Sequence, residues 1–188
     1  MIVDLGTGDG RAVLAAAAAD PLALIIGIDA DAASMAESSR RAARPARKGG
    51  RPNALFLAAG VEALDPVLDG CADLVTVTLP WGSLLRGALG LDEAAAFAIA
   101  RVAKPCGLVE MLVSVTPRDG IPSVPCLDER AIAGFAARYA ELGHCMVEAR
   151  PAKGDEIAAS GSTWAKRLLA TGSDRDVWRL ALRRMNPA

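Results

Sequence analysis

The chain alternates short apolar runs with stretches of helical periodicity, and this alternation limits the possible folds more than any other feature. The apolar runs predict strands at Ile2–Leu5, Leu24–Ile28, Ala54–Leu57, Leu74–Leu79, Gly107–Ser114, Cys145–Ala149 and Val177–Leu182. Helical periodicity lies between them, at Gly10–Ala19, Asp31–Ala43, Asp92–Ala103 and Asp128–Leu142. Strands that alternate with helices predict a mostly parallel sheet covered on both faces. The last two strands have no strong helix between them, which indicates an antiparallel final pair.

Three segments fit neither pattern: Arg44–Asn53, Pro80–Leu91 and Ala152–Asp176. Loops of this length are usually functional or disordered. We therefore look for function in and beside them.

Size and composition are those of one globular domain. The 188 residues are 52% hydrophobic and 23% charged. No apolar run reaches the roughly 20 residues of a membrane span, and the first residues do not resemble a signal peptide. We therefore expect a cytoplasmic protein without a membrane partner.

The cysteines are scattered and form no C-x-x-C pair; they are Cys71, Cys106, Cys126 and Cys145. This pattern suggests neither a metal site nor a disulfide framework. We interpret them as reduced packing residues.

A glycine turn follows the first strand and opens the first helix. Its spacing is G-x-G-x-G, at Gly6, Gly8 and Gly10. The dinucleotide fingerprint G-x-G-x-x-G would need a glycine at position 11, where this chain has Arg11. NAD and FAD are therefore disfavoured as ligands. Asp4 and Asp9 surround the turn with negative charge, which opposes a pyrophosphate and suits an ammonium and a sulfonium. The turn therefore predicts a site for S-adenosylmethionine.

An acid ends the second predicted strand. Asp29 can accept both hydroxyls of a ribose, whereas Asp31 suits the cap of the next helix; the alternative is that Asp29 caps it. After the third strand, Ala58 to Gly60 offer small residues that can lie against adenine, with Glu62 near its edge.

The segment after the fourth strand contains Trp81. Its neighbours Leu79 and Pro80 offer no polar side chain to grip an exocyclic amine. This favours an acceptor with a free lone pair, such as a ring nitrogen of adenine, which needs no base before attack. We interpret Trp81 as a platform for the base, the alternative being a core aromatic at a strand end.

Trp164 lies among small polar and basic residues, which makes it a poor core candidate. We expect it to stack on the other face of a flipped base, at about 1–3 kcal/mol per stack.

Trp178 lies in an alternating strand and is predicted to be core. His144, at a helix end, is interpreted as a surface or capping residue.

Taken together, these motifs resemble the aminoglycoside-resistance 16S rRNA (adenine-N1) methyltransferases of the kanamycin–apramycin type. The resemblance rests on the glycine turn, residues 28–31, residues 44–50, the block Leu79–Gly87 and residues 162–167, in that order. The block Pro80–Gly87 is its most specific part. The resemblance implies an α/β fold with a seven-stranded sheet, the fold of the class I (Rossmann-like) S-adenosylmethionine-dependent methyltransferases. Relatives begin with an extra N-terminal segment, which we expect to be missing from the single domain 1–188.

The resemblance implies an activity and its residues. Methyl transfer would modify N1 of a decoding-site adenine of 16S rRNA in the assembled 30S subunit and confer aminoglycoside resistance. Trp81 and Trp164 would clasp the adenine and act by positioning, without a protein base. The implied donor-site residues are Asp4, Gly6, Thr7, Gly8, Asp29, Ala59, Glu62, Thr78, Ser83 and Ser162.

Nucleic-acid binding must depend on the distribution of charge, because the net charge is only −1. The family docks partly through a basic linker between the second and third strands, where this chain has Arg40, Arg41, Arg44, Arg47, Lys48 and Arg51. These cations could neutralise phosphates, or they could form an ordinary solvated helix end. Arg167, Arg175 and Arg179 are expected to add phosphate contacts, although Arg179 could equally be an outward strand residue.

Two other functions stay open on the sequence. One is a class I methyltransferase that acts on another RNA or a small metabolite. The other is a catalytically silent nucleotide- or ribosome-binding module. In each case we expect a monomer.

Overall fold

The computed structural model describes residues 1–116, 119, 121, 124, 127–163, 165–166 and 175–186. A seven-stranded sheet has the order β3-β2-β1-β4-β5-β7-β6. Its strands are β1 (Ile2–Leu5), β2 (Ile25–Asp29), β3 (Ala54–Ala58), β4 (Ala72–Thr78), β5 (Ala103–Val113), β6 (His144–Pro151) and β7 (Trp178–Arg184). Neighbouring strands among the first five, β1 to β5, pair in parallel, whereas β7 pairs antiparallel with β5 and β6. The predicted sheet and its antiparallel final pair are confirmed.

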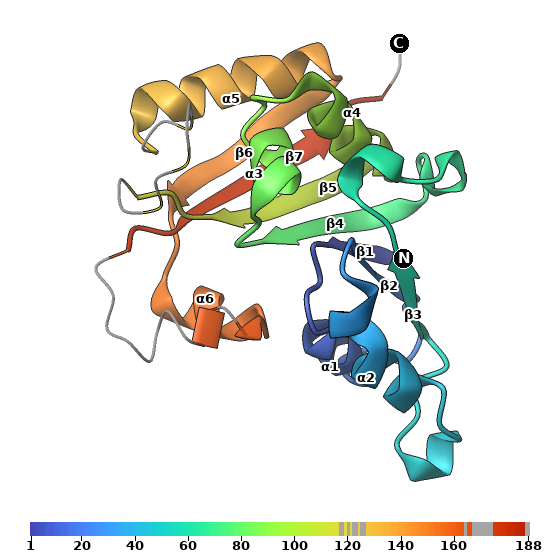
Figure 1. Ribbon diagram of the computed structural model, residues 1–188. Coiled ribbons are helices and arrows are strands. Elements are labelled where there is room, and N and C mark those ends of the chain that lie inside the picture. The colour runs from blue at the N-terminus through green and yellow to red at the C-terminus, as the bar shows by residue number, and fades with distance from the viewer. Residues whose placement is uncertain are drawn as a thin grey trace.

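Helices cover both faces of this sheet (Figure 1). One face carries α1 (Arg11–Ala19), α2 (Ala32–Ala42) and α6 (Gly154–Ala159), and the other carries α3 (Gly82–Ala88), α4 (Glu93–Val102) and α5 (Glu129–Glu141). Short 3-10 helices in the described part of the chain include η1 (Ala46–Lys48), η2 (Val61–Ala63) and η3 (Pro66–Leu68).

Aspartates begin three of the longer helices. The side chains of Asp31, Asp92 and Asp128 accept hydrogen bonds from backbone amides in the first turns of α2, α4 and α5. Such caps satisfy amides that the helix itself leaves without a partner. Asp31 therefore has the capping role that the sequence predicted for it.

The strand order brings the carboxyl ends of β1, β2 and β4 to one edge of the sheet. The chain moves outward from β1 through β2 to β3, then returns to place β4 on the other side of β1. Open α/β sheets bind ligands at the point where the order reverses in this way. The glycine turn after β1 lies at that point.

The main core lies between the sheet and α3, α4 and α5. Val3, Val75 and Val109 project from neighbouring strands into this layer and are completely buried. A smaller cluster on the opposite face joins α1 and α2 to β2 and β3 through residues such as Val13 and Ile25. The two clusters fix the first half of the sheet from both sides.

Two of the segments that resisted assignment contain short helices, α3 within Pro80–Leu91 and α6 within Ala152–Asp176. Both begin at a glycine and are too short to show a clear helical period, so the sequence pattern could not reveal them. In the described part of the chain, no helix has the length and apolar character to cross a bilayer.

The interpretation of His144 as a surface residue is wrong, whereas its contact with the carbonyl of Leu142, the residue that caps the end of α5, fits the capping alternative. Its side chain is 1% exposed at the start of β6, with Nδ1 3.1 Å from the Leu142 carbonyl oxygen. Burial lowers the pKa of His144, because the charged imidazolium loses its hydration. Trp178 does pack against the main core, as predicted.

The cysteines are less buried than the sequence suggested. Cys106 and Cys145 are exposed and Cys71 is half-buried, so the packing role is wrong for the first two. Cys126 lies outside the described residues.

Tyr139 provides a test of how α5 holds α3. The ring is completely buried, and its hydroxyl donates a 3.1 Å hydrogen bond to the Gly87 carbonyl of α3. Tyr139→Phe should lower the free energy of unfolding by about 1 kcal/mol, and Tyr139→Ala by about 3–5 kcal/mol because it also removes the ring. Urea denaturation measures both changes. Equal stability of Tyr139→Phe and the wild type would show that this hydrogen bond contributes nothing.

Candidate functional site

A cavity of about 360 Å³ opens at the carboxyl ends of β1, β2, β3 and β4. All the predicted donor-site residues except Asp4 line it, and so does Trp81. The complete lining is Leu5, Gly6, Thr7, Gly8, Ile28, Asp29, Ala30, Ala59, Gly60, Val61, Glu62, Leu64, Thr78, Leu79, Pro80, Trp81, Ser83, Leu84, Ser162 and Thr163. The fold thus gathers segments that are widely separated in sequence around one space.

The Asp29 carboxylate holds the glycine turn. One of its oxygens accepts a 2.8 Å hydrogen bond from the Gly8 amide, and the other accepts a 2.9 Å bond from the Asp31 amide. Asp29 therefore does not cap α2. Each oxygen keeps a lone-pair direction for a further donor, since a carboxylate can accept about four hydrogen bonds.

Two serines of α2 hold the same turn from a second direction. Ser34 Oγ donates to the Gly8 carbonyl at 2.8 Å, and Ser38 Oγ donates to the Asp9 carbonyl at 2.5 Å. The sequence analysis missed both residues. Their signal is the spacing of four residues, which puts two small hydroxyls on one face of a helix.

Gly8 has the backbone conformation that glycine favours, with φ +59°. A Cβ atom built on Gly8 would meet no heavy atom within 4 Å. The turn therefore presents bare backbone to open space in the cavity, which is the arrangement that a closely approaching ligand needs.

A cavity of about 20 Å³ continues past the turn toward Asp4. It shares Gly6, Thr7, Thr78 and Ser162 with the 360 Å³ cavity. Asp4 Oδ1 accepts a 2.6 Å hydrogen bond from Thr76 Oγ1. Burial raises the pKa of Asp4, and the nearby Asp29 carboxylate acts in the same direction. A cationic group in this cavity would relieve that unfavourable burial of charge.

Trp81 also lines the 360 Å³ cavity and is 44% exposed. It is therefore not the core aromatic that the sequence left open. The preceding Leu79 is buried in a left-handed conformation, with φ +48°, and its amide donates a 2.7 Å hydrogen bond to the Leu112 carbonyl. This bend ends β4 and directs the next residues along the cavity.

The segment after α6 also contributes to the wall of the 360 Å³ cavity. Ser162 and Thr163 line the cavity, and Ala165 is completely buried in a cluster with Leu79 and Ile157. Trp164 and Arg167 lie outside the described residues, so their predicted roles stay predictions. Thr163 is a further residue that the sequence analysis missed.

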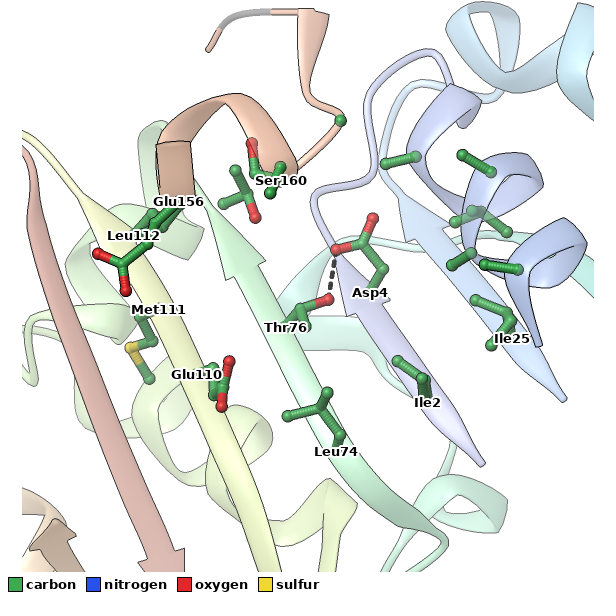
Figure 2. Close-up of a pocket in the computed structure, with 18 of the residues that line it drawn as sticks. Ile2, Asp4, Ile25, Leu74, Thr76, Glu110, Met111, Leu112, Glu156 and Ser160 are labelled. Atoms are coloured by element: carbon green, nitrogen blue, oxygen red, sulfur yellow. Dashed lines mark hydrogen bonds between the residues drawn. The ribbon is translucent and has the colours of Figure 1, made fainter. Parts of the chain in front are cut away.

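Another cavity, of about 560 Å³, lies on the sheet face between α1 and α6 (Figure 2). Three of its charged residues form ion pairs: Arg179 lies 3.0 Å from Glu110 and 3.9 Å from Glu156. Asp4 and Thr76 face it from β1 and β4. Asp4 also lines the 20 Å³ cavity beside the glycine turn, so the two cavities share this carboxylate.

The basic linker leaves the fold at the end of α2. Its cations other than Arg51 are exposed, and Arg51 is half-buried and donates to the Gly50 carbonyl. Arg40 pairs with Glu37 at 3.0 Å and Arg44 lies 3.9 Å from the same carboxylate. In the described residues, Arg41, Arg47 and Lys48 form no ion pair.

Gly50 fixes the base of this linker. A Cβ atom there would lie 1.6 Å from the Arg44 carbonyl oxygen, so only glycine fits. The linker is therefore a defined turn rather than an open loop.

Two arginines that the sequence analysis expected to contact phosphate form ion pairs with carboxylates of this chain. Arg175 forms an ion pair with Asp119, and its side chain is only 17% exposed. Arg179 pairs with Glu110 and Glu148 on the sheet face. Both guanidinium groups are held by carboxylates of distant segments, which leaves little of either available to a nucleic acid. In the described residues, no cluster of side chains suits a metal ion.

Comparison with known proteins agrees with this geometry. Residues 1–183 match the family described as "NpmA: 16S rRNA (adenine(1408)-N(1))-methyltransferase". A protein of Streptoalloteichus tenebrarius named 16S rRNA (adenine(1408)-N(1))-methyltransferase is 36% identical over 184 residues, which cover 94% of this chain and 84% of that protein. An Escherichia coli protein of the same name is 27% identical over 95% of this chain and 84% of its own length.

Solved structures give the same result in three dimensions. The 16S rRNA methyltransferase KamB superposes with a TM-score of 0.88 at 32% identity, over 98% of this chain and 87% of its own. The W203A mutant of the 16S rRNA (adenine(1408)-N(1))-methyltransferase from Catenulisporales acidiphilia was crystallised with its cosubstrate S-adenosylmethionine. It superposes with a TM-score of 0.87 at 32% identity, over 99% of this chain and 86% of its own. The sheet order, the cavity at the glycine turn and these matches together assign the chain to the aminoglycoside-resistance 16S rRNA (adenine-N1) methyltransferase family, with its class I fold.

Proposed function

We propose that this protein transfers a methyl group from S-adenosylmethionine to N1 of a decoding-site adenine of 16S rRNA, in the assembled 30S subunit, and so confers aminoglycoside resistance. One observation carries the proposal. The half-exposed Trp81 stands at the wall of the same cavity that the glycine turn, Asp29 and Glu62 line. A site for a nucleoside donor and a platform for a base thus share one space.

The donor half fits an adenosyl group with a cationic amino-acid end. Asp29 and Glu62 line the cavity where ribose and adenine need acceptors, and Gly8 leaves room for close approach. Asp4 lies in the small continuing cavity, where its buried carboxylate suits an ammonium group. S-adenosylmethionine supplies a methyl group made electrophilic by its sulfonium.

The acceptor half works by positioning. A ring nitrogen of neutral adenine already exposes its lone pair, so the protein needs no base to prepare it. We assign Trp81 to one face of the flipped adenine and Trp164 to the other, with Thr78 and Ser83 beside the methyl group. Holding reactants in line can supply about 7–11 kcal/mol of the barrier, so placement alone can account for a large rate enhancement.

The basic linker would dock the enzyme on the subunit. Arg41, Arg47 and Lys48 are the linker cations with the fewest local partners, and the turn at Gly50 holds them in a defined place. One chain carries both the linker and the donor cavity, so the proposed reaction needs no second copy. We place this monomer in the cytoplasm, where 30S subunits assemble.

Labelled methyl transfer tests the function. We expect the wild type to transfer radioactive methyl from S-adenosylmethionine to 16S rRNA of purified 30S subunits. Primer extension should then stop at one adenine of the decoding region, because a methyl group on N1 blocks pairing. Trp81→Ala should bind the donor and lose about 5-fold to 150-fold in rate, since a base stack is worth about 1–3 kcal/mol. Label in small molecules or in protein, without a stop, would refute the proposed substrate.

Asp29 tests the donor site. Asp29→Asn removes the charge and one of two accepting oxygens that hold Gly8 and the Asp31 amide. We expect the affinity for S-adenosylmethionine, measured by calorimetry, to fall about tenfold. The matched control is Asp31→Asn, which keeps a capping side chain outside the cavity and should bind like the wild type. Equal affinity of the two variants would remove Asp29 from the donor site.

The linker tests docking. Replacing both Arg47 and Lys48 by Glu should weaken 30S binding most at low salt and reduce the salt dependence by about one unit per lost phosphate contact. Donor affinity should stay unchanged, because neither residue lines the cavity. Arg130→Glu on α5 makes the same kind of charge change on another helix and serves as the control. Wild-type binding by the linker variant across salt concentrations would place docking elsewhere.

A further inference from the structure

The C-terminal part of the chain contacts the glycine turn through one side chain. Thr163 Oγ1 donates a 2.7 Å hydrogen bond to Asp9 Oδ2, although the two residues are 154 positions apart in sequence. Asp9 lies inside the glycine turn, whereas Thr163 belongs to the segment between α6 and Ala165. This contact therefore joins the glycine turn to the segment that follows α6.

Asp9 is a rigid acceptor. Its other carboxylate oxygen accepts a 3.1 Å hydrogen bond from the Arg11 amide, and the Arg11 Nε atom lies 3.4 Å from Oδ2. The Asp9 main-chain carbonyl is held by Ser38. Contacts to both its carboxylate and its main chain hold Asp9 in place, so its carboxylate offers the Thr163 hydroxyl a defined acceptor.

The segment that carries Thr163 is anchored at its beginning by a charged clamp. The Glu156 carboxylate of α6 receives two hydrogen bonds from the Arg150 guanidinium, at 2.5 and 2.7 Å, and Arg150 belongs to β6. Bidentate pairs of this kind fix orientation as well as distance. The clamp therefore sets where α6 ends and where the following residues start.

A hydrophobic anchor holds the other end. Ala165 is completely buried in the cluster that contains Ile157 of α6 and Leu79 at the end of β4. Between these anchors the chain turns at Gly161, with φ +69°, and Ala165 donates its amide to Ser162 Oγ at 3.4 Å. Hydrophobic packing thus holds the segment at Ala165, and the Thr163 hydrogen bond connects it to the glycine turn.

We propose that Thr163 is a positioning residue, whose hydrogen bond to Asp9 sets the spacing between the glycine turn and residues 160–163. The inference rests on the proposed function, because that spacing matters only if donor and base must meet in line. Thr163 acts through Asp9 and leaves the grip on the donor to Asp29 and the turn. Loss of the bond should therefore reduce turnover more than donor affinity.

The experiment compares Thr163→Val, which keeps the shape and removes the hydroxyl, with Thr163→Ser, which keeps the hydroxyl. On 30S subunits we expect Thr163→Val to lower kcat about tenfold, the size expected for losing a hydrogen bond to a charged acceptor. Its donor Kd by calorimetry and its Tm should match the wild type. Thr163→Ser should keep kcat within about twofold of the wild type.

Hydrogen exchange gives a readout independent of activity. Thr163→Val should speed exchange at the Ala165 and Lys166 amides, which bond to Ser162, while α6 keeps its protection. Thr163→Ser should restore the slow exchange. Unchanged exchange in Thr163→Val would overturn the inference even if the enzyme proved inactive on 30S subunits.

The remaining outcomes separate the two proposals. A wild type that fails to methylate 30S subunits refutes the proposed function, and the exchange data then decide the Thr163 contact alone. Wild-type kcat in Thr163→Val overturns the positioning role. A parallel loss of donor affinity would make Thr163 a donor-site residue, and a lower Tm without rescue by Thr163→Ser would make it merely structural; either result overturns the inference.

Discussion

The hydrogen bond from the Gly8 amide to the Asp29 carboxylate, 2.8 Å long, is the constraint on which the site depends. It joins the turn after β1 to the end of β2, and the amides of Gly6 and Thr7 add bonds to the Ile28 carbonyl at 2.8 and 3.1 Å. The pairing of two adjacent strands thus continues into the turn. A cavity forms because the backbone is held here in a shape that side chains cannot fill.

The regular pattern of the sequence was sufficient to predict the sheet and the four longer helices to within a few residues. Periodicity reports burial, and these elements bury one face. It could not reveal α3 or α6, because a helix of one or two turns gives too few repeats. It also misjudged the exposure of His144, although not its place at a helix end, since a lone imidazole gives no sign that Tyr139 packs beside it.

The candidate site was predictable where one motif supplies several neighbours, as in the glycine turn and the block around Trp81. It was not predictable where contacts join distant segments. Arg175 and Arg179 look as available in the sequence as Arg47, yet Asp119 and Glu110 neutralise the first two in the folded chain. Ion pairs across strands depend on register, which composition does not contain. The linker differs because its cations lie on an exposed excursion with one nearby acid, Glu37.

The strained residue at the end of β4, Leu79, connects the segment of Trp81 with the segment after α6. A non-glycine residue in the left-handed region costs about 1–3 kcal/mol, so Leu79 must be held there by its surroundings. Its amide bonds to Leu112, and its side chain packs with Ile157 and Ala165. The bend that directs the chain toward Trp81 is therefore stabilised by residues on both sides of position 164. The same segment after α6 thus has two connections to the site, one by hydrophobic packing against Leu79 and one by the hydrogen bond from Thr163 to Asp9.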